Sequence, residues 1–245
     1  MSRLSTSKWT KYKVMRKAAN LLPYLPRTEW LSQRSLWRML DHYDQVIIKP
    51  TGSYGGHGVI RIKKLDHGTY QVHNGPRKKT YEDETALNAY IQTYSKKTYL
   101  VQQRIPLATV NGRPFDLRVM VQRSSRKAPW QVTGKLAKVA GKGFIVTNVR
   151  RSSGKVVSVE HVLKHSALKS MPQAKLLGQM NKVALASAKQ LASSYPWVRT
   201  MGIDMGMDQD GNVWVIEANF VPMLELFLKL KDKSMFYRIK SFSKK

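Results

Sequence analysis

The sequence predicts an α+β fold, built as one compact unit of two lobes. Strand patterns occupy residues 46–62, 99–105, 115–122 and 201–219, and turn signals interrupt the first and the last of these stretches. Helical spacing of apolar residues is confined to stretches between the strands, at 36–43, 87–94 and 171–195. A length of 245 residues with 42% hydrophobic content is sufficient for a sizeable core.

The first strand pair is interrupted by a glycine-rich loop. A short apolar strand ends at Lys49, an alternating strand resumes at Val59, and the loop between them holds Gly52, Ser53, Gly55, Gly56 and Gly58. Glycines allow successive backbone N–H groups to point at one anion, and a lysine supplies a compact positive charge for phosphate. The loop lacks the GxxxxGK[ST] pattern of a P-loop, and no helix pattern follows it as in a dinucleotide fingerprint. A simple hairpin turn is the alternative, although the loop is long for one.

The second pair of strands covers residues 99–122. In its second strand the odd positions form one apolar face, from Phe115 to Val121. Asp116 and Arg118 share the opposite face, where we interpret them either as functional residues or as a surface ion pair of little energetic value.

The longest helix is predicted over residues 171–195. Pro172 suits its first turn, and an apolar face runs from Leu176 to Leu191. We expect this helix to pack on the sheet that carries Asp204.

The last strand pair, residues 201–219, places two carboxylates opposite each other. Asp210-Gly211 is a strong signal for a two-residue hairpin turn. Partners across such a hairpin have residue numbers that sum to 421, so Asp204 faces Glu217. Like charges opposite each other are destabilising unless they are neutralised, and Mg²⁺ prefers such hard oxygen ligands. Asn219 follows on the same face and offers a further oxygen.

Two other interpretations of this segment compete with a Mg²⁺ site. Asp208, Asp210, Gly211 and Glu217 match positions 3, 5, 6 and 12 of an EF-hand loop, but Gly206 stands at position 1 and the flanks are strand-like. The other interpretation is an ordinary hairpin with polar ends.

Taken together, these segments resemble the ATP-grasp superfamily. The resemblance rests on the order KPxxGSxGGxGV, VQQxI, FDLRVMVQ, TN and GIDxxxDxxGxxWxIEANxxP, and it runs from about Lys8 to Met223. The sequence is most similar to the YheC/YheD-type endospore coat-associated branch, with a second similarity to ligases that add glutamate to a ribosomal protein. Members of the superfamily activate a carboxylate with ATP and join it to a nucleophile.

The resemblance implies a role for each motif. Lys49 would contact the α- and β-phosphates, and the loop of Gly52, Ser53, Gly55, Gly56 and Gly58 would form a flap over the triphosphate. Adenine would be framed by the hinge residues Gln102, Gln103, Arg104 and Ile105. Arg118 would meet the γ-phosphate or an acyl phosphate, with Asn148 nearby. Mg²⁺, or Mn²⁺ in its place, would be held by Asp204, Glu217 and Asn219.

The same resemblance predicts how the chain is divided. Residues 31–228 are expected to form the ATP-grasp domain, with a first lobe at 31–104 and a second lobe at 105–228 that carries the metal site. Residues 1–30 are expected to be a basic lead-in segment in place of a larger N-terminal substrate domain, and 229–245 a basic tail. Lys8 or Lys11 is a candidate for the additional phosphate lysine that relatives carry upstream.

The reaction implied is an ADP-forming ligation of a carboxylate to an amine through an acyl phosphate. The chain has no cysteine, no GxSxG and no HExxH, which fits a reaction driven by positioning and charge neutralisation. One alternative is transfer of the γ-phosphate to a hydroxyl. Another is a non-catalytic basic module of the same fold that binds a polyanion.

The net charge is the strongest compositional anomaly. Forty-three Lys and Arg stand against fifteen Asp and Glu, giving +28 at pH 7. Such a field attracts polyanions, among them nucleic acid, an acidic peptide or an anionic envelope polymer, although no nucleic-acid motif is present. No apolar run approaches the roughly 18 residues that span a bilayer. We expect a cytoplasmic protein, and the resemblance adds the forespore or the spore coat.

Overall fold

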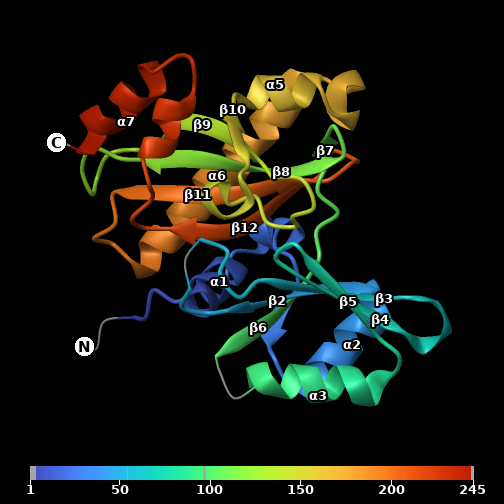
Figure 1. Ribbon diagram of the computed structural model, residues 1–245. Helices are drawn as coiled ribbons and strands as arrows, with labels where there is room; N and C mark the ends of the chain where they lie inside the picture. The colour runs from blue at the N-terminus through green and yellow to red at the C-terminus, as the bar shows by residue number, and fades with distance from the viewer. Residues whose placement is uncertain (1–3, 54, 96–97, 244–245) are drawn as a thin grey trace.

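A computed structural model describes residues 4–53, 55–95 and 98–243. The chain forms two lobes, each with its own antiparallel sheet, stacked one above the other in Figure 1. Residue 54 of the glycine-rich loop and the ends of the predicted lead-in and tail lie outside the described residues.

The first lobe is a 6-stranded sheet in the order β1-β6-β2-β3-β4-β5. Its helices α2 and α3 cover one face, and their apolar residues pack with those of the strands into one core. The other face is directed toward the second lobe. The elements of this lobe are β1 (Thr28–Trp30), α2 (Gln33–Tyr43), β2 (Gln45–Pro50), β3 (Ile60–Lys64), η2 (Asp66–Gly68), β4 (Tyr70–Asn74), β5 (Arg77–Tyr81), α3 (Glu84–Ser95) and β6 (Tyr99–Gln103).

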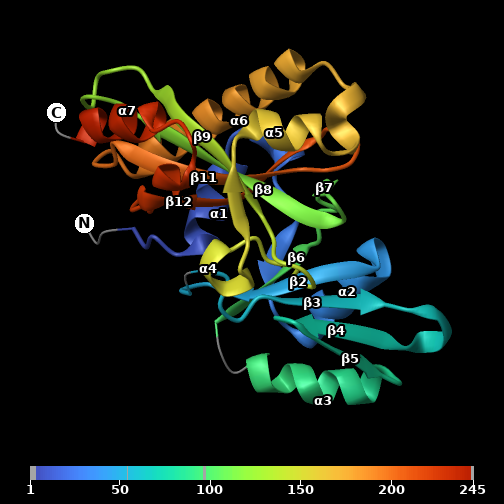
Figure 2. The same cartoon turned by 45° about the horizontal axis from the view of Figure 1, so that its top comes forward.

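The second lobe is a sheet in the order β10-β9-β8-β11-β12, with β7 paired to β8. Its elements are β7 (Thr109–Val110), β8 (Arg113–Gln122), β9 (Gln131–Val139), α4 (Val149–Ser152), β10 (Lys155–Val157), α5 (Val159–Lys164), η3 (Ala167–Ser170), α6 (Gln173–Ser194), β11 (Thr200–Met207), β12 (Val213–Asn219), η4 (Glu225–Lys229) and α7 (Ser234–Ser243). Figure 2 shows α6 lying along this sheet and α7 over one end of it.

The first helix of the chain also belongs to this second lobe. Helix α1 (Lys8–Arg16) contacts α6 and β12, and the following turn η1 (Ala19–Tyr24) contacts the same two elements. Ser7 caps α1 by accepting a hydrogen bond from the Thr10 amide. The next element, β1, pairs with β6 in the first lobe.

The predicted helices are present, with small differences at their ends. The 171–195 pattern forms α6, which begins at Gln173 with Pro172 at its N-cap, and α6 packs on β11 and β12 as expected. Part of the predicted basic tail is also helical, since α7 buries Ile239 against Met120 and Leu136 of the sheet. None of the helices in the described part of the chain is long and apolar enough to cross a membrane.

The β11–β12 hairpin pairs Asp204 with Glu217, as predicted, but by a different route. Near the turn each β11 residue pairs with the β12 residue one position before the predicted partner. The reason is that the turn is one residue longer than predicted, since Asp208 N donates a hydrogen bond to Asn212 O. Ile216 is then an extra residue on β12, a β-bulge that shifts the register back. As a result both Ile216 and Glu217 line the space between the lobes.

Candidate functional site

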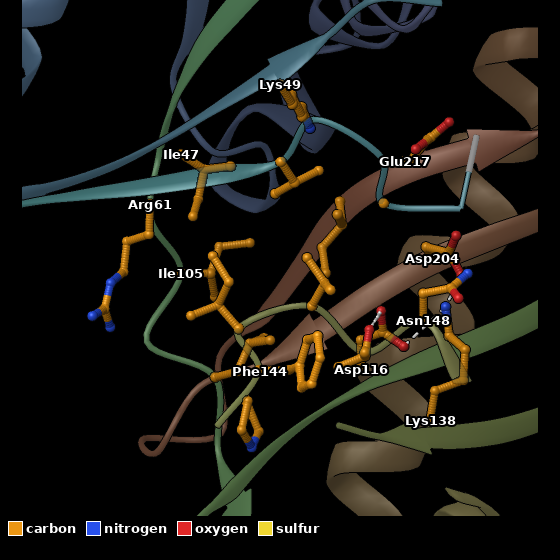
Figure 3. A pocket seen from close by; sticks show the side chains of 18 of the residues that line it. Ile47, Lys49, Arg61, Ile105, Asp116, Lys138, Phe144, Asn148, Asp204 and Glu217 are labelled. Carbon is orange, nitrogen blue, oxygen red and sulfur yellow. Dashed lines mark hydrogen bonds and ion pairs between the residues drawn. The ribbon is translucent and has the colours of Figure 1, made fainter. Parts of the chain in front are cut away.

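A cavity of about 700 Å³ lies between the two lobes, within the size range of small-molecule sites. Strands of both sheets contribute to its walls, and the side chains converge on it from both sides in Figure 3. Two carboxylates and their basic partners gather at one end, where Asp204 and Glu217 are labelled.

Asp204 is the centre of a buried hydrogen-bond network. Its Oδ1 accepts from Arg118 Nε at 2.7 Å and from Lys138 Nζ at 3.0 Å. Its Oδ2 accepts from Arg118 Nη2 at 2.9 Å and from Asn219 Nδ2 at 3.1 Å. A carboxylate has about four lone-pair sites, so these four hydrogen bonds use the whole acceptor capacity of Asp204.

Lys138 joins Asp204 to a second buried acid. Its Nζ lies 3.0 Å from Asp116 Oδ1, and Asp116 Oδ2 accepts a hydrogen bond from the Thr147 hydroxyl. Asp116 and Lys138 are direct partners on the β8–β9 ladder, as Arg118 and Asp204 are on the β8–β11 ladder. The interpretation of Asp116 and Arg118 as a surface ion pair is therefore wrong, because both are buried and each pairs with a different residue.

The pKa values of this network follow from burial opposed by pairing. Burial alone would raise the pKa of Asp204, but Arg118 and Lys138 hold it well below its usual value. Burial would lower the pKa of Lys138, and Asp116 and Asp204 instead raise it. Burial raises the pKa of Asp116 in spite of the nearby Lys138. Asp204, Arg118 and Lys138 stay charged at neutral pH, and the two cations are held in place on the cavity wall.

Glu217 and Asn219 suit a Mg²⁺ ion, whereas Asp204 as arranged here does not. Both Glu217 and Asn219 line the cavity, and the Asn219 amide donates its N–H to Asp204, which leaves its oxygen as the ligand atom. Asp204 could reach a metal only by giving up one of its present hydrogen bonds. In the described part of the chain, no three acidic, histidine or cysteine side chains are grouped as a ready metal site. The assignment of Asp204 as a ligand remains a prediction.

Three lysines surround Glu217. Lys49 is buried at the end of β2 and donates a hydrogen bond to Gln102 Oε1 at 2.8 Å. Burial lowers the pKa of Lys49 to about 8, although the charge of Glu217 opposes this. Lys8 Nζ lies 3.7 Å from Glu217 Oε1, and Lys11, whose pKa is also lowered by burial, donates to the Ala218 carbonyl. Helix α1 therefore adds positive charge to the phosphate end of the predicted site.

The glycine-rich loop lies against the second lobe. A Cβ on Gly55 would lie 3.4 Å from Asn148 Nδ2, and one on Gly56 would lie 3.6 Å from Val146 Cβ. Both glycines have positive φ, at 68° and 74°, which side chains rarely adopt. Asn148 caps the short helix α4, since its Oδ1 accepts from Arg151 N at 2.8 Å. The loop thus lies close to Val146 and Asn148 of the segment 141–148, and residues of both segments line the cavity.

The middle of the cavity is apolar. Ile47 from the first lobe, Ile105 from the hinge and Phe144 from the 141–148 segment lie between the two ends in Figure 3. Ile216, the bulged residue, lines the same space, and Gly206 leaves room for Leu107, since a Cβ there would lie 2.5 Å from Leu107 Cδ2. Two apolar walls from opposite lobes form a slot suited to a flat aromatic ring.

Most of the predicted site residues line this single cavity. Gly52 and Gly58 do not; Gly58 instead packs closely under Pro50 and Tyr99. The residues that do are Lys49, Ser53, Gly55, Gly56, Gln102, Gln103, Arg104, Ile105, Arg118, Asn148, Asp204, Glu217 and Asn219. Sequence reasoning missed Lys138 and Thr147. The alternation of β9 could have indicated Lys138, but no motif marks it.

Comparison with known proteins agrees with this architecture. The chain resembles the ATP-grasp ligase PsnB, solved with a phosphomimetic variant of its minimal precursor, Mg and ADP, with a TM-score of 0.57 at 16% identity over 97% of this chain and 57% of that one. It also resembles the ADP complex of N5-carboxyaminoimidazole ribonucleotide synthetase PurK, with a TM-score of 0.52 at 15% identity over 90% of this chain and 46% of that one. The fold is therefore that of the ATP-grasp superfamily.

The chain belongs to the YheC/D-like ATP-grasp family, whose model matches residues 2–242. It is 28% identical over 228 residues to the endospore coat-associated protein YheD of Bacillus subtilis (strain 168), covering 90% of this chain and 49% of YheD. It is 22% identical over 233 residues to YheC of the same strain, covering 92% of this chain and 62% of YheC. The chain thus spans about half of YheD and somewhat more of YheC.

Proposed function

We propose that this protein is an ATP- and Mg²⁺-dependent ligase that joins a carboxylate to an amine and forms ADP. The observation that carries the proposal is the polarity of one cavity, in which an apolar slot beside the hinge leads to a cluster of lysines, an arginine and the partly exposed Glu217. ATP has the same polarity, with a flat base at one end and a polyphosphate at the other. The ATP-grasp ligases PsnB and PurK, each solved with ADP, support the class of enzyme.

The nucleotide would lie along the cavity from the hinge to Glu217. Gln103 and Ile105 line the slot where adenine would pack between Ile47 and Ile216. Lys49 and Lys8 would bind the phosphates, and the backbone of Gly55 and Gly56 would cover them. Mg²⁺, held by Glu217 and Asn219, would neutralise phosphate charge.

The chain itself supplies positioning and charge for the transfer step. The substrate carboxylate attacks the γ-phosphate and ADP leaves; the amine then displaces phosphate from the acyl phosphate to give an amide. Arg118 and Lys138, fixed by Asp204 and Asp116, hold positive charge where negative charge develops on the transferred group. Because these cations are already paired and oriented, little reorganisation is needed during the reaction.

The cell compartment follows from the relatives alone. YheD and YheC are named as endospore coat-associated proteins, and we extend this association to the present chain. An acidic peptide or polymer is the substrate class that a chain of net charge +28 would attract. Fractionation of spore layers with an antibody against this chain tests the location.

Titration calorimetry with a non-hydrolysable ATP analogue, with and without Mg²⁺, tests the nucleotide site. We expect metal-dependent binding that is lost in Glu217→Gln, and loss of ATP turnover in both Glu217→Gln and Lys49→Ala with folding retained. Glu225→Gln and Lys189→Ala are matched controls, because each changes the charge equally at an exposed position outside the cavity. Full turnover in Glu217→Gln or Lys49→Ala would refute the proposal.

Two alternatives remain distinguishable by product and by salt. A phosphotransferase would release ADP with a phosphorylated hydroxyl and no amide, which mass spectrometry separates from the ligase product. A non-catalytic module would bind a polyanion with steep salt dependence, indifferent to ATP and to Glu217→Gln. The high net charge favours this second alternative if the nucleotide titration fails.

A further inference from the structure

A row of aligned side chains crosses the first-lobe sheet on the face that lines the cavity. Gln102 on β6 is paired with Ile47 on β2, and Ile47 is paired with Arg61 on β3. Arg61 is in turn paired with His73 on β4, and His73 with Lys78 on β5. Directly paired residues share a face of the sheet, and all five line the cavity. Beyond Ile47 the row is therefore entirely basic.

Two further arginines extend this basic group. Arg104 of the hinge and Arg113 at the start of β8 line the same cavity, so residues of both lobes contribute. Burial and then the charge of Arg61 lower the pKa of Arg104. His73 has a different role, because its Nε2 lies 3.0 Å from the Gly143 carbonyl and it thereby holds the 141–148 segment.

This basic group lacks acidic partners. Within the described residues, no carboxylate forms a salt bridge with Arg61, Lys78, Arg104 or Arg113, although the chain pairs other basic residues with acids. The hydrogen-bond partners of Arg61 and Arg104 are neutral amides, Gln71 at 2.8 Å and Gln45 at 2.9 Å. Arg61 Nε is buried with no hydrogen-bond partner in the described part of the chain. Burial lowers the pKa of His73, which lies between Arg61 and Lys78, and so favours its neutral form. The arginines and Lys78 still line one cavity without an acid, and a buried donor without a partner is itself unfavourable.

Arg61 and the predicted phosphate site lie at opposite ends of the cavity. In Figure 3, Arg61 is at one end, Asp204 and Glu217 are at the other, and Ile105 and Phe144 lie between them. A nucleotide with its 5′-phosphates at Lys49 would direct no phosphate toward Arg61. The 5′-phosphates of one nucleotide therefore cannot bind both Lys49 at one end and Arg61 at the other.

We propose that Arg61, Lys78, Arg104 and Arg113 form a second anion site, which takes a phosphate or carboxylate group additional to the 5′-phosphates of the nucleotide. The anion would accept from the Arg61 guanidinium on the cavity side and would bridge the two lobes through Arg61 and Arg113. Its source is either a phosphate on the ribose of the nucleotide or a separate small anion. The proposal rests on the proposed nucleotide site for its account of the other end of the cavity.

Matched ligands separate the two sources by calorimetry on the full chain. The first arm compares adenosine 5′-monophosphate with adenosine 2′,5′- and 3′,5′-bisphosphate, which differ only in the ribose phosphate. The second arm titrates inorganic pyrophosphate into the protein alone and into the protein saturated with ADP. We expect one arm to show a gain in affinity of about tenfold or more, either of a bisphosphate over the monophosphate or of pyrophosphate for the protein with ADP bound. A hydrogen bond to a charged group contributes at least this much to affinity.

The variant Arg61→Gln must remove that gain. Lys63→Gln is the matched control, since Lys63 is on the same strand two residues away, carries the same charge and does not line the cavity. A gain in the first arm assigns the anion to the nucleotide, and a gain in the second assigns it to a separate ligand. The proposal is overturned if neither arm shows a gain that depends on Arg61, or if Arg61→Gln weakens the monophosphate and the bisphosphates equally, as stacking on the base would.

The test also separates this proposal from that of the nucleotide site. If ADP fails to bind, the proposed function fails, and pyrophosphate binding to the protein alone still tests the dependence on Arg61. If ADP binds and no second anion does, only the second anion site is refuted.

Discussion

Asp204 lies directly opposite Glu217 on the β11–β12 ladder, yet the two carboxylates have opposite surroundings. Asp204 is buried and uses its full hydrogen-bonding capacity on Arg118, Lys138 and Asn219. Glu217 is partly exposed in the cavity, with Lys8 as its nearest cation. One acid is thus a fixed part of the protein, and the other is available to a ligand.

We predict that Asp204→Asn destabilises the protein by about 3–5 kcal/mol, because it leaves two buried cations with one acid fewer. Glu217→Gln should change the free energy of unfolding by about 1 kcal/mol or less, since its charge is partly solvated. Urea denaturation of the apo proteins measures both. If repulsion between the two acids dominated instead, Asp204→Asn would be neutral or more stable than the wild type.

The affinity for ADP should fall as the pH rises through about 8, by at most about tenfold per pH unit. Burial lowers the pKa of Lys49 to about 8, so the ammonium that binds phosphate is lost above that pH. Lys49→Arg should flatten the profile, because a guanidinium stays charged. Calorimetry between pH 7 and 9 tests this, and equal slopes in both proteins would exclude Lys49 as the titrating group.

The same shift has the opposite effect on stability. Below pH 8 the folded state holds a poorly solvated charge at Lys49, whereas above it the folded lysine is neutral and the unfolded one is still protonated. The free energy of unfolding should therefore rise with pH between about 8 and 10.5 at this residue, and Lys49→Met should lack that rise. Denaturant titrations across this range provide the check.

Gly202→Ala should impair turnover while leaving ADP binding intact. A Cβ at Gly202 would lie 3.0 Å from Arg118 Cδ and 2.7 Å from Pro222 Cβ, so it would displace the arginine that we propose to contact the γ-phosphate. ADP has no γ-phosphate and should not report the change. We expect kcat to fall about tenfold or more, since an oriented charge contact is lost.

Gly178→Ala is the matched control for that variant. Gly178 lies in α6 with nothing near its Cβ position, so alanine there should raise stability by about 0.5–1 kcal/mol and leave turnover unchanged. Normal turnover in Gly202→Ala would show that Arg118 does not act on the transferred phosphate.

Gly206→Ala should weaken adenine binding specifically. Its Cβ would lie 2.5 Å from Leu107 Cδ2, so the Leu107 side chain, which lines the cavity, would have to move. We expect the affinity for ADP to fall about tenfold and that for pyrophosphate to remain, because the phosphate end is untouched. A parallel loss for both ligands would indicate a general disturbance of the hairpin.

Local patterns predicted the strands β2, β3, β6, β8, β11 and β12, the helices α2, α3 and α6, and the opposition of Asp204 to Glu217, but not the other elements. That pairing was reached although the turn is one residue longer than predicted, because the bulge at Ile216 compensates for the shift. Strict alternation from Val213 and Val215 would place Glu217 on the core face. A bulge depends on contacts across the sheet, which a single strand pattern does not contain.

The partners of the buried charges could not be predicted in the same way. Asp116 and Arg118 are close in sequence, and the pattern favoured pairing them with each other. Their actual partners, Lys138 and Asp204, come from two different neighbouring strands. Which strands flank β8 is decided by the tertiary fold. The sequence alone therefore does not identify Lys138 as the partner of Asp116.

The side-by-side pairing of β1 with β6 makes the first lobe an insertion held on a narrow neck. The chain leaves the second lobe after η1 and returns after β6, and the two passages are bonded to each other through Gln103 N and Arg27 O at 2.8 Å. Lys49 travels with the inserted lobe, whereas Lys11 is bound to β12 on the other. The positive charge around Glu217 therefore depends on contact between the two lobes, since Lys49 comes from one lobe and Lys11 from the other.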